Sequence, residues 1–241
     1  MAELTVSLAS LAGRSGRGVR IAVVDSGIYA AHPHVGGIAG GVALDVEGHP
    51  VGDVIDRVGH GTAVAAAILE KAPEAELLAV KVFDRSLATT VAALVGAIRW
   101  AANAEAALIN LSLGTANAAH APALAAAVRE ASALGSFVVA AAPQDGVSWL
   151  PGALPGVIAV QLEWECPRDA CWLTSAPVGS FHLRACGFPR PIPGVPPAEN
   201  EKGQSFAVAN ATGLIALAIE GERVSSWASL VDRVRGFATT V

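Results

Sequence analysis

Residues 203–218 read GQSFAVANATGLIALA, and the fold and function of the chain depend on how this stretch is interpreted. Ser205 lies between small or flexible residues and precedes an apolar, alanine-rich run, which predicts that a helix begins at this serine. Free main-chain N–H groups and the positive end of the helix dipole meet there, so an oxyanion would be stabilised. An isolated serine of this kind is more commonly a helix cap than a nucleophile, and the residues upstream must decide between the two.

Upstream of this helix, β-branched apolar runs alternate with helical segments. The predicted strands cover residues 19–24, 77–83, 107–114, 136–142 and 157–160, with a short strand and loops within 36–52. The predicted helices cover residues 59–68, 88–104, 121–134, 205–218 and 224–237, and residues 163–203 are expected to form a hairpin and loops. This alternation predicts an α/β fold, a parallel sheet of about six or seven strands with helices on both faces. Residues 1–241 are expected to form one domain.

Composition excludes several classes of protein. The chain is 53% hydrophobic and 15% charged, which is typical of a globular protein. Its net charge is −5 and its 16 Lys and Arg residues are scattered, so no basic surface for nucleic acid is expected. The longest apolar runs reach about fifteen residues, fewer than a membrane-spanning helix needs. The first twenty residues contain Glu3 and no apolar core typical of a secretory signal, which predicts a cytoplasmic protein.

Two polar residues upstream occupy positions where catalytic groups are commonly found. Asp25 ends the predicted strand 19–24, and in open α/β sheets ligands and catalytic groups collect at the carboxyl ends of strands. His60 opens the predicted helix that begins near residue 59. Taken separately, the aspartate could cap a turn and the histidine could be an ordinary helix-end residue.

Six blocks of the sequence together resemble the subtilisin-like serine peptidases, the subtilase family. They are VRIAVVDSGI (19–28), GHGTAVAAAI (59–68), LLAVKVF (77–83), ALINLSLG (107–114), FVVAAAPQDG (137–146) and GQSFAVANATG (203–213). They follow the family's order and cover residues 19–220 with gaps. The resemblance implies a serine endopeptidase in which Ser205 is the nucleophile, His60 the general base and acid, and Asp25 the group that orients the histidine.

The resemblance also implies an oxyanion donor and a substrate-binding edge. The family's second oxyanion donor is an asparagine, and Gln144 occupies its place, after Pro143. A substrate peptide would pair as a strand with Leu111, Ser112, Leu113 and Gly114. Ala141 and Ala142 would line the pocket for the side chain before the scissile bond, which favours small or medium side chains.

Several family features are absent from the sequence. The loop that binds calcium in many members is missing, since residues 68–73 continue directly, so no calcium and no other cofactor is expected. No propeptide is recognisable before residue 19. Ala63 replaces a second histidine that the family often has.

Three cysteines, Cys166, Cys171 and Cys186, lie close together in the sequence. Their odd number excludes a complete set of disulfides, and reduced thiols are expected. Two alternatives remain open: a zinc site formed by these cysteines with His182, and a Cys166–Cys171 disulfide.

The predicted function is peptide hydrolysis, with peptides or proteins as substrates and a specialised role such as precursor processing. The alternative is a degenerate family member that binds a peptide without cleaving it, suggested by the changes at Pro143, Gln144 and Ala209. Acyl transfer or ester hydrolysis by the same residues is a third, weaker hypothesis.

Overall fold

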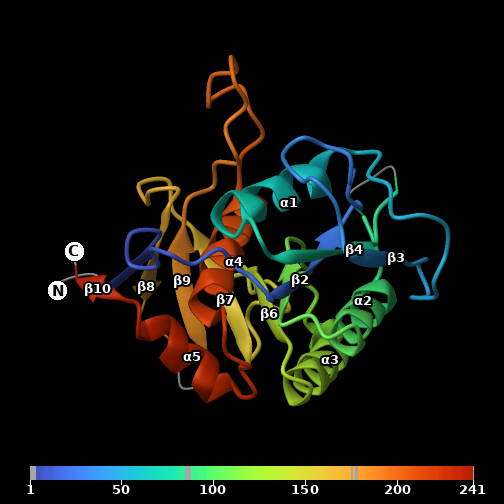
Figure 1. Cartoon of the computed structure of the whole chain (residues 1–241). Helices are drawn as coiled ribbons and strands as arrows, with labels where there is room; N and C mark the ends of the chain where they lie inside the picture. The colour runs from blue at the N-terminus through green and yellow to red at the C-terminus, as the bar shows by residue number, and fades with distance from the viewer. Residues whose placement is uncertain (1–3, 85–87, 175, 177–178, 241) are drawn as a thin grey trace.

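A computed structural model describes residues 4–84, 88–174, 176 and 179–240. Within this part of the chain, ten strands form one sheet in the order β10-β1-β8-β9-β7-β6-β5-β2-β4-β3 (Figure 1). The strands are β1 (Leu4–Ser7), β2 (Arg20–Asp25), β3 (Gly40–Ala43), β4 (Glu76–Lys81), β5 (Leu108–Leu111), β6 (Phe137–Ala141), β7 (Val157–Leu162), β8 (Ala170–Thr174), β9 (Phe181–Ala185) and β10 (Thr239–Thr240).

The central strands of the sheet are parallel, as the sequence predicts. From β3 across β4, β2, β5, β6 and β7 to β9, every neighbouring pair is parallel. The sheet is larger than expected because β8, β1 and β10 extend it with antiparallel pairs. The predicted hairpin within 163–203 is confirmed, since β8 and β9 pair antiparallel there.

Helices cover both faces of the sheet. They are α1 (His60–Lys71), α2 (Val91–Asn103), α3 (Ala121–Ala133), α4 (Gln204–Ile219) and α5 (Trp227–Arg235), with a short 3₁₀ turn at Ala118–His120. One hydrophobic cluster joins α1, α4 and α5 to one face of the sheet, and a second joins α2 and α3 to the other face (Figure 1). Every residue from Phe206 to Ile219 is buried, so α4 is a core helix.

The strand order reverses at the place in the sheet where the site is found. Strand β2 lies between β4 and β5, so the chain places β4 on one side of β2 and then crosses to build β5 and β6 on the other. At such a reversal of strand order, the loops leaving the carboxyl ends of the two strands diverge. The ends of β2 and β5 therefore hold Asp25 and Ser112 near one another.

A close approach of main chains brings α1 to the end of β2. A Cβ atom at Gly61 would lie 2.2 Å from the carbonyl oxygen of Gly27 and 3.2 Å from the Cβ of Asp25. Only glycine fits at this contact, so the second residue of α1 rests directly on the turn that follows β2. His60 is thereby held beside the carboxyl end of that strand.

The three cysteines are free and buried, which rules out the Cys166–Cys171 disulfide in this structure. Burial raises the pKa of the Cys166 thiol to about 12, and it also raises that of Cys171. Among the residues that the structure describes, no group of His, Cys, Asp or Glu side chains is arranged to hold a metal ion. The thiols of Cys166 and Cys171 therefore remain protonated at neutral pH, and all three cysteines pack as small apolar side chains.

Lys71 is a buried lysine at the end of α1, with 4% of its surface exposed. Its ammonium group donates to Glu70, which also accepts from Arg168. Burial lowers the pKa of Lys71 to about 8, and the hydrogen bond with Glu70 opposes this only in part. The unfolded chain therefore binds more protons than the folded chain between pH 8 and the usual lysine pKa near 10.5.

We expect Lys71→Met to remove a pH dependence of stability. Because the pKa is lowered on folding, the contribution of Lys71 to the free energy of unfolding rises by about 3 kcal/mol from pH 8 to pH 10.5. Chemical denaturation across this range should therefore show wild type gaining stability relative to the methionine variant. Lys202→Met, at an exposed position, is the control. If the difference in free energy of unfolding between wild type and Lys71→Met were the same at all pH values, the prediction would be contradicted.

Candidate active site

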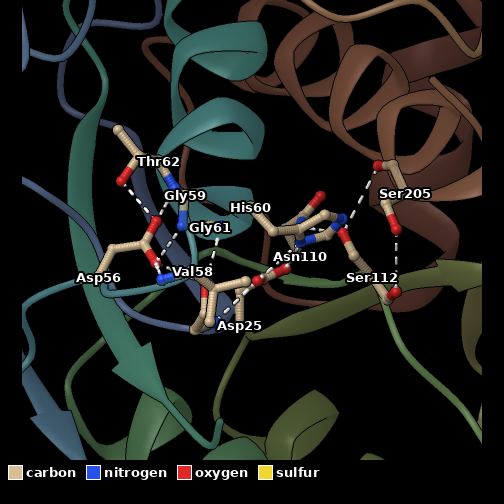
Figure 2. Close-up of polar contacts among 11 residues, drawn as sticks. Asp25, Asp56, Val58, Gly59, His60, Gly61, Thr62, Asn110, Ser112 and Ser205 are labelled. Carbon is tan, nitrogen blue, oxygen red and sulfur yellow. Dashed lines mark hydrogen bonds and ion pairs between the residues drawn. The ribbon is translucent and has the colours of Figure 1, made fainter. Parts of the chain in front are cut away.

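Asp25 and His60 form a carboxylate–imidazole pair in which the carboxylate is buried and the imidazole is partly exposed. Nδ1 of His60 lies 2.8 Å from Oδ1 and 2.9 Å from Oδ2 of Asp25 (Figure 2). The carboxylate is 1% exposed and also accepts a hydrogen bond of 2.7 Å from the main-chain N–H of Ser26. Because a carboxylate only accepts, Nδ1 carries the proton, and Nε2 of the neutral imidazole keeps a free lone pair. His60 is therefore oriented to act as a base through Nε2.

The charges around His60 favour its protonated form. Burial disfavours the imidazolium, but the hydrogen bond and charge of Asp25 outweigh it, and the pKa of His60 lies above its usual value. Glu201 and Asp56 add smaller contributions in the same direction. An imidazole with this pKa can take a proton from an alcohol and return it to a leaving group near neutral pH.

Ser205 lies in the first turn of α4, across from the imidazole of His60 (Figure 2). The aromatic ring of the next residue, Phe206, packs against the imidazole with ring centroids 5.8 Å apart. The Ser205 hydroxyl donates to the carbonyl oxygen of Ser112 at 3.3 Å, and it makes no hydrogen bond with His60 among the described residues. The structure thus brings the acid and the base together, and the serine lies opposite them with its hydroxyl engaged elsewhere.

A buried polar chain that sequence reasoning missed supports the Ser112–Ser205 contact. The Nδ2 of Asn110 donates to Oγ of Ser112 at 3.0 Å, and Oδ1 of Asn110 lies 2.9 Å from the hydroxyl of Thr212 in α4. Asn110 and Thr212 are fully buried. The signal in the sequence is a single asparagine within the apolar strand 107–114, which indicates a satisfied polar group in the core.

Gln204 is a second residue that sequence reasoning missed. Its Oε1 accepts from the main-chain N–H of Leu162 at 3.0 Å, and its Nε2 donates to the carbonyl oxygen of Val160 at 2.7 Å. The side chain therefore ties the start of α4 to the end of β7, immediately before Ser205.

Gln144 lies in a tight hairpin. Its main chain exchanges hydrogen bonds of 3.1 and 2.9 Å with Val147, and Asp145 and Gly146 both have positive φ angles. Nε2 of Gln144 donates to Oδ2 of Asp145 at 3.3 Å. One N–H of the amide predicted to be an oxyanion donor is therefore bound by its neighbour in this structure.

The predicted substrate-binding edge has an open and a buried part. Leu111 is fully buried in the core, so its side chain does not reach the site. The main chains of Leu113 and Gly114 have no hydrogen-bond partner among the residues described, before Thr115 exchanges bonds with Leu150. A pocket of about 450 Å³ opens beside them, lined by residues such as Phe83, Leu94, Leu113 and Gly114.

Ala141 and Ala142 lie at the end of β6. Ala142 is buried and its main-chain N–H donates to Val160 at 2.8 Å, whereas Ala141 is half-buried. A Cβ atom at Gly152 would lie 1.7 Å from the carbonyl oxygen of Ala141. The main chain at Gly152 is thus packed directly against the main chain of Ala141 and Ala142.

Comparison with known proteins identifies the family. Residues 16–162 match the family model described as the Subtilase family. The chain belongs to the subtilase family. The predicted resemblance and the α/β subtilisin-like fold are therefore confirmed.

Among the relatives are proteins described as proteases. A thermostable alkaline protease of Halalkalibacterium halodurans is 38% identical over 177 residues, which are 68% of this chain and 47% of the relative. Subtilisin Savinase of Lederbergia lenta is 31% identical over 238 residues, covering 92% of this chain and 82% of the relative. Of the solved structures, Sphericase superposes with a TM-score of 0.68 at 24% identity, over 92% of this chain and 83% of that one, and shows the same fold. The chain spans about half the length of the first of these relatives.

The relatives correct the predicted localisation. They are secreted extracellular alkaline subtilisins, so the prediction of a cytoplasmic protein is wrong. Within the described residues, no helix is long and apolar enough to cross a membrane.

Proposed function

We propose that the chain is a serine endopeptidase in which Asp25, His60 and Ser205 form the catalytic triad. The observation that carries this proposal is the Asp25–His60 pair, with contacts of 2.8 and 2.9 Å, facing the N-terminus of the helix that bears Ser205. The helix N-terminus and the imidazole supply what acyl transfer needs, which is a place for negative charge and a base for the hydroxyl proton.

In the proposed reaction, Oγ of Ser205 attacks the carbonyl carbon of the scissile peptide and passes its proton to Nε2 of His60. Asp25 stabilises the imidazolium that forms. The imidazolium then protonates the leaving amine, and an acyl-enzyme remains. Water, activated by the same imidazole, hydrolyses this ester and restores Ser205.

The Ser205 hydroxyl must first leave Ser112. A rotation about the Cα–Cβ bond of Ser205 releases its hydrogen bond to the Ser112 carbonyl and turns Oγ towards the imidazole. Catalytic hydrogen bonds are commonly long or misaligned before substrate binds, and they tighten in the complex. A bound substrate strand that donates an N–H to the Ser112 carbonyl would compete with the hydroxyl for this acceptor and favour the rotation.

The open edge at Leu113 and Gly114 supports binding of an extended peptide by strand addition, with the neighbouring pocket receiving an apolar side chain. The close packing of Gly152 behind Ala141 and Ala142 favours a small side chain before the scissile bond. We further propose cleavage at few sites, as in precursor processing. Digestion of an unfolded casein-like protein, with mapping of the new amino termini, tests both proposals. Absence of cleavage would contradict the peptidase, and cleavage at many sites would contradict the restricted role.

The second candidate is a peptide-binding protein without turnover. The hydrogen bonds of Ser205 to Ser112 and of Gln144 to Asp145 favour it, because both groups are turned to partners outside the proposed reaction. In the peptidase, the main-chain N–H of Ser205 supplies one oxyanion donor, and Gln144 can supply another through the N–H that Asp145 does not accept, or by leaving Asp145.

We expect Gln144→Asn to raise kcat in the peptidase, by up to the 10²- to 10³-fold that one oxyanion donor contributes. The shorter amide restores the family's residue and is less able to reach Asp145. Hydrolysis of a chromogenic peptide, compared with Ser148→Ala at an exposed position just after the hairpin as a control, measures the effect. Activity in neither wild type nor Gln144→Asn would favour the binding protein.

A further inference from the structure

Asp56, four residues before His60, is a half-buried carboxylate with an unusual number of hydrogen bonds. Its Oδ2 accepts from the main-chain N–H of Thr62 at 2.9 Å and from the Thr62 hydroxyl at 2.6 Å. Its Oδ1 accepts from the main-chain N–H groups of Val58 and Gly59 at 2.9 and 2.8 Å and from the Ser26 hydroxyl at 2.9 Å (Figure 2). Both oxygens are thus fully used by groups around the start of α1.

These bonds replace a missing helix cap. Helix α1 begins at His60, and its N-cap residue, Gly59, has no side chain that could accept from the first turn. The first N–H groups of a helix need an outside acceptor, and a negative charge is favourable at that end. Asp56 supplies both, so the geometry of the turn that carries the imidazole depends on this carboxylate.

The same carboxylate reaches Asp25 through one residue. The Ser26 hydroxyl donates to Asp56 and accepts from the main-chain N–H of Gly61 at 3.0 Å. The main-chain N–H of Ser26 donates to Oδ1 of Asp25 at 2.7 Å. One side chain therefore holds the helix of the base and the strand end of the acid at a fixed separation.

We propose that Asp56 is a positioning residue that sets the orientation of His60 relative to Asp25 and Ser205, a role that rests on the proposed peptidase function. Burial disfavours ionisation of Asp56, but its hydrogen bonds outweigh this and lower its pKa, so the carboxylate is charged at neutral pH. The charged groups that act on His60 are Asp25, Glu201 and Asp56.

The experiment compares Asp56→Asn with Asp53→Asn. The amide removes the charge and turns an NH₂ group towards N–H donors that need an acceptor. Asp53 lies on the same loop, but it is exposed, and its hydrogen bonds among the described residues are with Ile55 and Arg57, not with α1. For each variant, kcat and KM on a chromogenic peptide and the rate of Ser205 phosphonylation by a fluorophosphonate are measured from pH 5 to pH 10.

We expect Asp56→Asn to lower kcat and the phosphonylation rate about 10- to 100-fold, because a small misplacement of a catalytic group has effects of this size. KM should stay within about twofold, and the acid limb of the pH profile should move to lower pH, since a charge that favours the imidazolium is lost. Asp53→Asn should match wild type in all three measurements.

If Asp56→Asn does not fold, Ser26→Ala tests the same proposal. It keeps the carboxylate but removes its link to Asp25, and a fall in kcat at unchanged KM is expected again. A wild type that the fluorophosphonate does not label would defeat the proposed function itself. With a labelled wild type, equal rates in the folded variants, or a raised KM at unchanged kcat, would contradict the role of Asp56 alone.

Discussion

Ser205→Ala is expected to abolish peptide hydrolysis, with a loss in kcat of about 10⁶-fold, the size seen when the nucleophile of subtilisin is removed. The methyl group cannot form the acyl-enzyme, so only direct attack by water remains, assisted by substrate binding and the oxyanion donors. The fold should be retained, because the hydroxyl makes one hydrogen bond, to Ser112, and α4 is held by its buried apolar residues.

Steady-state hydrolysis of a chromogenic peptide and a thermal unfolding curve measure the two effects. The control is Ser132→Ala. Ser132 is a half-buried serine of α3, which packs on the opposite face of the sheet from α4. If Ser205→Ala kept more than a hundredth of wild-type activity while folded, another group would have to be the nucleophile.

Asp25→Asn is expected to lower kcat by about 10⁴-fold, because an amide at this position no longer fixes the tautomer or stabilises the imidazolium. It should also move the acid limb of the pH profile to lower pH, since Asp25 is the group that raises the pKa of His60. Because the pKa of His60 is raised on folding, the Asp25–His60 pair stabilises the folded state most at pH values below the usual histidine pKa of 6.5. This contribution is lost as the pH rises through the pKa of folded His60.

Rates on the same peptide across pH measure both parts, and Asp45→Asn, an aspartate in the turn after β3, is the control. An activity within tenfold of wild type, or an acid limb that does not move, would show that the carboxylate does not act on His60.

Much of the fold could be predicted from hydrophobic pattern. The runs that become β2, β4, β5, β6 and β7 are mainly apolar and do not alternate with polar residues, which is typical of strands covered on both faces. Strands β1 and β10 could not be predicted this way. They are only four and two residues long, and they form strands because β1 pairs with β8 and β10 pairs with β1.

The candidate site could likewise be predicted only in part. Asp25, His60 and Ser205 each follow a recognisable local pattern, and their order matched a known family. The groups that support these three residues follow no such local pattern, because each makes its hydrogen bonds with a partner far away in the sequence. Gln204 bonds to β7, Asn110 to Thr212, and Asp56 to Ser26. The partner of the Ser205 hydroxyl likewise depends on how β5 meets α4. The predicted localisation was wrong because it rested on the absence of a signal-like pattern in the first twenty residues, and that absence does not determine where a protein is found.

The most direct test of the triad is reaction with a fluorophosphonate, followed by proteolysis and mass spectrometry of the adduct. The account predicts one phosphonylated residue, Ser205, in wild type, and at least a thousandfold slower labelling in folded His60→Ala, because the hydroxyl then has no base. A folded wild-type chain labelled at another residue, or not labelled at all, would contradict it.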